Sequence, residues 1–270
     1  MDKVFLLQVA VSFVIGGSLV AFLSLVAEKV SDNYAGMVLS LPSTVAISFF
    51  FFSLIFSPYR IPVIVPSVIV SLGGMLVLIV TYLYLSKLRL RSTASIILCA
   101  VGSIIIWTAF SIPIAITKFS NYPFSILIYV AIVSVAYGLI KLGTKKAING
   151  SRLTYSLIQK LIRAIFAGVI IALAVLLSKK AGIFWGGIFS VFPAAFLSTL
   201  IIYHWHYDSE FLFQISKKIP IGSLILFSFI ISAKYIFPQF DTYVGTGLSY
   251  LASIGCLIIL VTVQGQRYGR

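Results

Sequence analysis

The chain has 270 residues, of which 60% are hydrophobic and 10% are charged, and its mean hydropathy is +1.12. A soluble domain carries roughly 25% charged residues, so a water-soluble globular protein and a disordered chain are both excluded. Lysine and arginine number 20 against 6 aspartate and glutamate; because the basic residues lie in short connections between apolar runs, they indicate membrane orientation and contact with anionic lipid, not nucleic acid.

Nine apolar runs are long enough to cross a bilayer, which takes about 20 mostly apolar residues. The runs are continuous and lack the alternation of barrel strands. The first run follows Lys3 and is longer than the core of a secretory signal. Arg163 lies near the start of the sixth run, where its side chain is expected to reach the interface. We therefore predict an all-α polytopic membrane protein with spans at 4–27, 35–56, 61–85, 94–116, 122–141, 161–178, 182–203, 219–237 and 243–263.

An odd number of spans places the two termini on opposite sides of the membrane. Six of the 20 basic residues then fall on the side of the N-terminus and the other fourteen on the opposite side. The positive-inside rule predicts a plasma-membrane protein with its N-terminus outside and its C-terminus in the cytoplasm, and with anionic lipid headgroups bound at the cytoplasmic basic loops. The six residues are Lys3, Arg60, Lys118, Lys179, Lys180 and Lys234.

A shift of 151 residues aligns two stretches of the chain without a gap and gives six identities within residues 17–42. The second half carries about seven extra residues near 204–210. Because one span separates the halves, the second is inverted. We predict two four-helix repeats in inverted topology, residues 1–118 and 161–270, joined by a linker span and basic loop at 119–160. The identities pair Gly17 with Gly168, Ala21 with Ala172, Leu25 with Leu176, Lys29 with Lys180, Gly36 with Gly187 and Pro42 with Pro193.

Each repeat contains a helix with two small residues four apart, followed by a helix interrupted by proline. Small residues at this spacing let helix backbones approach closely, and here they are Gly17 with Ala21 and Gly168 with Ala172. Proline removes an amide donor and displaces the carbonyl one turn earlier, and in lipid that carbonyl needs a partner or a polar cavity. The interruptions therefore predict either a substrate path or two structural kinks. The candidate path residues are Gly36, Ser40, Pro42, Ser43, Thr44, Gly187, Ser190 and Pro193.

All six acidic residues lie in loops or at span ends. A carboxylate relay or a mid-membrane cation site is therefore not expected, and a neutral, zwitterionic, anionic or lipid-like solute fits better. One cluster after the seventh span has the imidazole and carboxylate groups that suit a divalent transition metal. The interpretation that we favour is a polar cap at the interface, so no metal and no cofactor is expected, and these residues are only weak candidates for metal ligands. The cluster consists of His204, His206, Asp208 and Glu210.

The two copies of the interrupted segment share an aromatic residue, a small residue, a glycine and, further on, an apolar residue before proline. They are Tyr34, Ala35, Gly36, Leu41 and Pro42 in the first copy, and Trp185, Gly186, Gly187, Phe192 and Pro193 in the second. This pattern resembles the short bacterial GlpM-like inner-membrane proteins, which have about four spans. The resemblance implies two fused copies of such a unit and a link to exopolysaccharide (alginate) production, without a settled molecular activity.

Three functions remain open from the sequence. The first, which we favour, is a transporter of a small solute or lipid precursor that works by rocking of the two repeats. The second is a non-catalytic accessory or scaffold subunit of an envelope or exopolysaccharide assembly system, which would meet a membrane partner or a second copy of itself. The third is an intramembrane lipid enzyme with a metal at His204 and His206; the first two functions need no catalytic residue.

Overall fold

The computed structural model describes residues 3–29, 37–88, 92–144 and 156–268, and every regular element within them is helical. The predicted all-α class is confirmed. The elements are α1 (Lys3–Lys29), α3 (Ser43–Phe56), the single turn η1 (Pro58–Arg60), α4 (Ile61–Leu85), α5 (Ser92–Thr117), α6 (Tyr122–Gly143), α7 (Leu157–Lys180), α8 (Ile183–Ser190), α9 (Ala194–His204), α10 (Ser209–Ser216), α11 (Ile219–Ile236) and α12 (Thr242–Tyr268).

Eight helical segments of the described chain are long and apolar enough to cross a membrane. One of them joins α8 and α9, and another joins α10 and α11. The remaining one of the nine predicted spans is the second in chain order, 35–56. It contains α3, which is apolar but has only 14 residues. Each predicted span thus contains apolar helix, and the chain is a multi-pass integral membrane protein. The extra residues of the second half lead into α10, a short helix before α11.

The core of the bundle is built around α4. This helix packs against α5, α6, α8 and α11, and most of its residues are buried. By contrast, α1, α5, α6 and α12 expose large apolar side chains on their outer faces, among them Leu127 and Leu251. Since lipid tails are as apolar as leucine, such faces suit direct contact with acyl chains.

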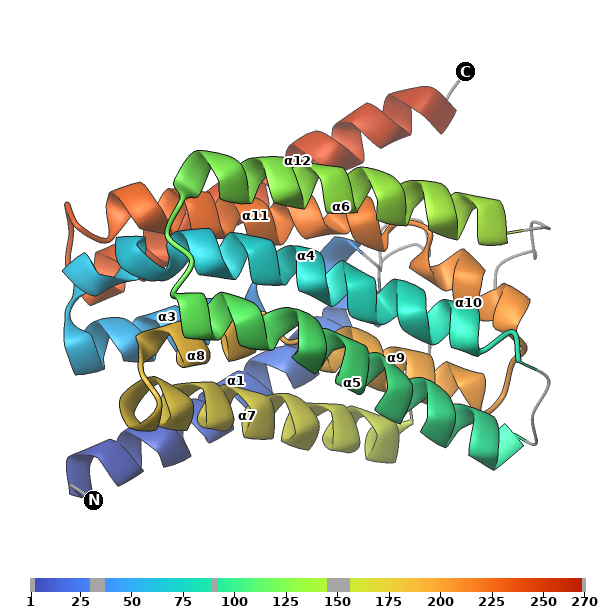
Figure 1. Cartoon of the computed structure of the whole chain (residues 1–270), viewed down its shortest axis with the longest axis horizontal. Helices are drawn as coiled ribbons and strands as arrows, with labels where there is room; N and C mark the ends of the chain where they lie inside the picture. Colours follow the sequence, from blue (N-terminus) through green and yellow to red (C-terminus); the bar gives the residue numbers. More distant parts are fainter. Residues whose placement is uncertain (1–2, 30–36, 89–91, 145–155, 269–270) are drawn as a thin grey trace.

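The helix ends gather at the two ends of the bundle, and the termini of the chain lie at opposite ends (Figure 1). The start of α1, the connection from α3 to α4, the end of α5 and the turn from α7 to α8 lie at the left end in this view. The six basic residues assigned to the N-terminal side belong to the helix termini at this end. Which side of the membrane each end faces stays a prediction.

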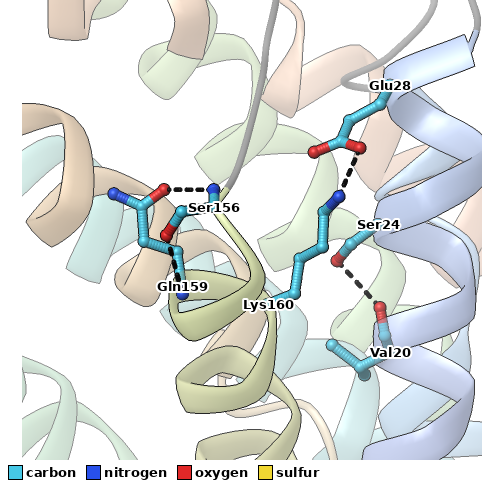
Figure 2. A network of polar contacts seen from close by, with 6 residues as sticks. All are labelled: Val20, Ser24, Glu28, Ser156, Gln159 and Lys160. Atoms are coloured by element: carbon cyan, nitrogen blue, oxygen red, sulfur yellow. Dashed lines mark hydrogen bonds and ion pairs between the residues drawn. The ribbon is translucent and has the colours of Figure 1, made fainter.

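An ion pair between Lys160 and Glu28 joins the start of α7 to the end of α1 (Figure 2). Ser156 and Gln159 form a capping box, in which each side chain accepts from the backbone N–H of the other, at 3.2 and 2.9 Å. One residue further along, Lys160 Nζ lies 2.7 Å from Glu28 Oε2. Since Glu28 is near the end of its helix and Lys160 near the start of its own, α1 and α7 run antiparallel.

The predicted repeats share one core. In the structure α1 packs along α7, and α3 packs against α8, so helices of residues 1–118 lie between helices of residues 161–270. One hydrophobic cluster includes buried side chains from both halves, for example Phe49 and Phe229. The division at 119–160 therefore stays a prediction about sequence similarity, and the two halves fold around each other.

Candidate functional site

Gly17 and Gly168 lie where α1 crosses α7. A Cβ atom on Gly17 would lie 2.8 Å from the Ala164 carbonyl oxygen, and one on Gly168 would lie 2.7 Å from the Phe13 carbonyl oxygen. Since Cβ atoms do not approach backbone this closely, only glycine fits at either position. The two contacts exchange under the 151-residue shift, because Phe13 then falls on Ala164. The predicted partners in the small-residue motifs, Ala21 and Ala172, are half-buried.

Pro42 lies between the helical residues Met37 and Val38 and the start of α3. Its φ of −74° and ψ of 55° lie outside the helical region. The Ser43 N–H donates to the Leu41 carbonyl at 2.7 Å, and the helix restarts when the Ala46 N–H donates to the Pro42 carbonyl at 2.9 Å. The predicted kink is therefore a break, in which one helix ends before the proline and another begins after it.

Pro193 separates α8 from α9 in the same way. Its φ is −79° and its ψ is 54°. The Ala194 N–H donates to the Phe192 carbonyl at 2.8 Å, and the Leu197 N–H donates to the Pro193 carbonyl at 2.8 Å. Two positions 151 residues apart thus have the same backbone course and the same pattern of hydrogen bonds.

The hydroxyl side chains at the breaks are buried: Ser40, Ser43, Thr44 and Ser190. Ser190 donates to the Gly187 carbonyl at 2.6 Å, so it supplies a partner for the backbone just before the second break. Gly187 itself faces α4, where an added Cβ would lie 3.0 Å from Val68. The remaining candidate, Gly36, lies outside the described residues.

The space beside both breaks is filled. Leu39, before the first break, and Thr199, in α9, line a cavity of about 20 Å³, which has room for about one water molecule. At the second break, the Trp107 ring of α5 meets Phe189 and Phe192 edge-on, with centroid distances of 5.3 and 4.9 Å. The structure therefore shows both breaks in a packed state.

The prediction for Arg163 is wrong. Its side chain was expected at the interface, but it is 0% exposed, and its guanidinium donates to the Thr199 hydroxyl. Thr199 in turn donates to the Ala195 carbonyl at 2.7 Å, so the buried charge is tied to the helix after the second break. The distance of Arg163 from the helix end could have indicated its burial. Arg163 lies six residues beyond the start of α7 at Leu157, or about 9 Å along the axis.

His204 turns away from the other weak metal candidates and into the bundle. Its Nδ1 lies 3.1 Å from the Tyr82 hydroxyl of α4, and its Nε2 lies 3.4 Å from the Ser95 hydroxyl of α5. Both ring nitrogens are therefore engaged by helices distant in sequence. This polar contact between three helices was missed by sequence reasoning, because nothing local to His204 identifies Tyr82 or Ser95 as its neighbours.

The other members of the predicted metal cluster do not gather around a common point. Asp208 caps α10 by accepting from the Phe211 N–H at 3.0 Å, while His206 and Glu210 are exposed. Within the part of the chain that the structure describes, no group of three His, Cys, Asp or Glu side chains is close enough to hold a metal ion.

Treatment with the metal chelator EDTA is expected to leave the stability of the protein unchanged. By contrast, Tyr82→Phe is expected to lower the free energy of unfolding by about 1 kcal/mol, because one nitrogen of His204 loses its partner. Thermal melts of the purified protein in detergent, with and without EDTA, measure both effects. A fall in melting temperature with EDTA that added Zn²⁺ reverses would restore the metal hypothesis.

Residues 160–264 match a family described as "Protein of unknown function (DUF3147)". The match extends from the start of α7 into α12, so it covers the second predicted repeat and none of the first. The chain has no match among curated proteins and none among solved structures. The resemblance to GlpM-like proteins therefore depends only on the residues quoted for it, and the family match assigns no activity.

Proposed function

We propose that the protein transports a small solute or lipid precursor and that its two halves are inverted repeats that rock against each other. The paired breaks at Pro42 and Pro193 carry this proposal, because they share backbone angles and hydrogen bonds. Since α1 and α7 are antiparallel, the helices that follow them enter the bundle from opposite ends. Matching broken helices in inverted halves are the best pointer to a transporter site.

The moving units in this proposal are the hairpins of α1 with α3 and of α7 with α8 and α9. They meet at the Gly17–Gly168 crossing, where backbone touches backbone without intervening side chains, so the crossing is a suitable pivot. Separation of Leu39 from Thr199 would open the space beside the first break and expose its carbonyl groups to a solute. The buried charge of Arg163 favours a neutral, zwitterionic or anionic solute.

A second candidate function is supported by the packed state of the breaks. A non-catalytic accessory or scaffold subunit of an envelope or exopolysaccharide assembly system needs no path through the bundle. The outer faces of α6 and α12, which expose large apolar side chains such as Leu127 and Leu251, would then meet a membrane partner or a second copy. Neither candidate needs a catalytic residue, and both place the more basic end of the bundle in the cytoplasm at the plasma membrane.

Thiol labelling distinguishes the two functions without a known substrate. Ser40→Cys and Ser190→Cys place one thiol in each break, in a background carrying Cys99→Ala and Cys256→Ala. If the bundle rocks, a membrane-impermeant maleimide should reach the first thiol from the end of α1 near Glu28 and the second from the opposite end. We expect each to react at least about tenfold faster from its own side than from the other, which corresponds to about 1.4 kcal/mol.

The matched control is Ser71→Cys in α4, where the side chain is also 0% exposed but lies in the static core. It should stay unlabelled from both sides. Equal protection of all three thiols, in protein that melts like the parent, would reject the rocking transporter and leave the accessory function.

A further inference from the structure

A cavity at the N-terminal end of the bundle lies apart from the two breaks. It has a volume of about 370 Å³, is open on one side, and is lined by the end of α3, the start of α4, the end of α5 and the turn from α7 to α8. Its wall includes the aromatic side chains of Phe56, Phe184 and Trp185. This volume and this lining are within the range of small-molecule sites, which pair apolar walls with a few polar groups.

The charged residues that line the cavity are both basic, Arg60 and Lys118. Neither side chain makes an ion pair, a hydrogen bond or a ring contact with the residues that the structure describes. Lys179 and Lys234, at the same end of the bundle, instead each lie 4.4 Å from the centroid of an aromatic ring. Arg60 and Lys118 are both exposed, so two positive charges lie at the mouth of one cavity with no acidic residue in its lining.

Lys118 occupies a backbone position that glycine normally fills. The Phe119 N–H donates to the Ile114 carbonyl at 3.3 Å and the Lys118 N–H donates to the Ala115 carbonyl at 3.4 Å, which is the Schellman arrangement at the end of a helix. Lys118 accordingly has a φ of 50°, in the left-handed region where a side chain is disfavoured. A lysine at a backbone position that favours glycine indicates that the lysine side chain has a role at this site.

Positive backbone φ angles cluster around this cavity. Besides Lys118, the described residues with such angles are Gly182, at 106°, which lines the cavity, and Ser57, at 111°, which follows Phe56 in its wall. Glycine adopts such angles freely, so only Lys118 and Ser57 have strained backbone, which persists at ligand sites where the surrounding structure holds it. Two separate connections of the chain thus carry unusual backbone at the same place.

We propose that this cavity binds the phosphate group of a ligand, with Arg60 and Lys118 as its ligating residues. The guanidinium fork and the ammonium group both match phosphate oxygens, and the aromatic wall accommodates an apolar portion of the same molecule. A lipid headgroup and a soluble phosphate compound share this chemistry. The proposal concerns binding alone and holds whether or not the bundle transports.

Trp185 provides a direct readout of binding. The chain has three tryptophans, so Trp107→Phe with Trp205→Phe leaves Trp185 as the sole reporter in the cavity wall. The purified protein in a neutral detergent is titrated with dioctanoyl-phosphatidylglycerol, with dioctanoylglycerol, which has no phosphate group, and with inorganic phosphate, and the emission of Trp185 is followed. A saturable change with phosphatidylglycerol supports a lipid headgroup as the source, and one with inorganic phosphate supports a soluble source.

The matched comparison is between two double variants that remove the same charge from the same end. Arg60→Gln with Lys118→Gln should weaken binding at least about tenfold, equivalent to about 1.4 kcal/mol, whereas Lys179→Gln with Lys234→Gln should leave it nearly unchanged. Equal loss in both variants, an equal response to dioctanoylglycerol, or no saturable change with either anion would overturn the proposal.

Lys118→Gly separates ligand binding from structure. Glycine adopts the left-handed backbone freely, so this variant should melt about 2 °C higher while its binding falls. A gain in stability with undiminished binding would show that the lysine side chain has no role in the site, and would also overturn the proposal.

Discussion

Gly17→Leu is expected to lower the free energy of unfolding by about 3 kcal/mol or more. The new Cβ would lie 2.8 Å from the Ala164 carbonyl oxygen, and backbone can yield only if all of α7 moves away. Gly168→Leu should have a similar effect, because its Cβ would meet the Phe13 carbonyl. Since both changes separate the same helix pair, the double variant should lose less than the sum. Chemical denaturation of the purified protein in detergent measures these effects.

Gly138→Leu in α6 and Gly247→Leu in α12 are the matched controls. Both glycines are helical, and a Cβ on either would meet nothing within 4 Å. Leucine has a higher helix propensity than glycine, so these variants should be as stable as the parent or slightly more so. If Gly17→Leu behaves like the controls, α1 and α7 do not cross at this glycine.

Trp107→Ala is expected to lower the free energy of unfolding by about 3–5 kcal/mol, because a large buried ring is removed and a cavity is left. The ring is 3% exposed and contacts Phe189 and Phe192, immediately before the second break. Its loss removes the side chain that keeps this break packed. In protein that still folds, the Ser190→Cys thiol should therefore react faster with maleimide.

Trp107→Phe tests whether packing or polarity matters at this position. The indole Nε1 has no hydrogen-bond partner among the described residues, so phenylalanine keeps an aromatic contact and removes a buried donor that is not satisfied. We expect a loss below about 1 kcal/mol. Equal stability of the Ala and Phe variants would contradict the role assigned to the ring.

The spans and the positions of the breaks could be predicted from the sequence because both depend on local properties. Run length and apolarity decide whether a segment crosses the membrane, and the missing amide of Pro42 or Pro193 acts within its own turn. The nature of the interruption could not be predicted in the same way. Whether the chain bends or breaks depends on hydrogen bonds that Ser43 and Ala194 make after the proline.

The partners across the bundle could not be predicted, since in lipid one apolar helix face resembles another. Gly17 indicated close packing without identifying α7. Arg163 was expected at the interface because its partner, Thr199, is 36 residues away. His204 was grouped with neighbouring carboxylates, yet the fold turns its ring toward Tyr82, 122 residues away.

The cavity lined by Arg60 and Lys118 could not be predicted from the sequence either. In the sequence, Arg60 and Lys118 indicate only the orientation of the chain in the membrane, because they belong to different connections. Only the fold brings these connections and the α7–α8 turn around one space. Glycine at 182 was compatible with many turns, and the positive φ angles of Lys118 and Ser57 had no sequence signal.

The α1–α7 pair is fastened differently at its two ends. Near Glu28 the fastening is an ion pair with Lys160, whereas at the other end Lys179 lies over the ring of Phe5. Dissolved salt screens the attraction between a partly exposed acid and base, and part of the contact between an ammonium group and an aromatic ring is apolar. We therefore expect rising ionic strength to weaken the contact between α1 and α7 at the end near Glu28 before it weakens the contact at the end near Phe5.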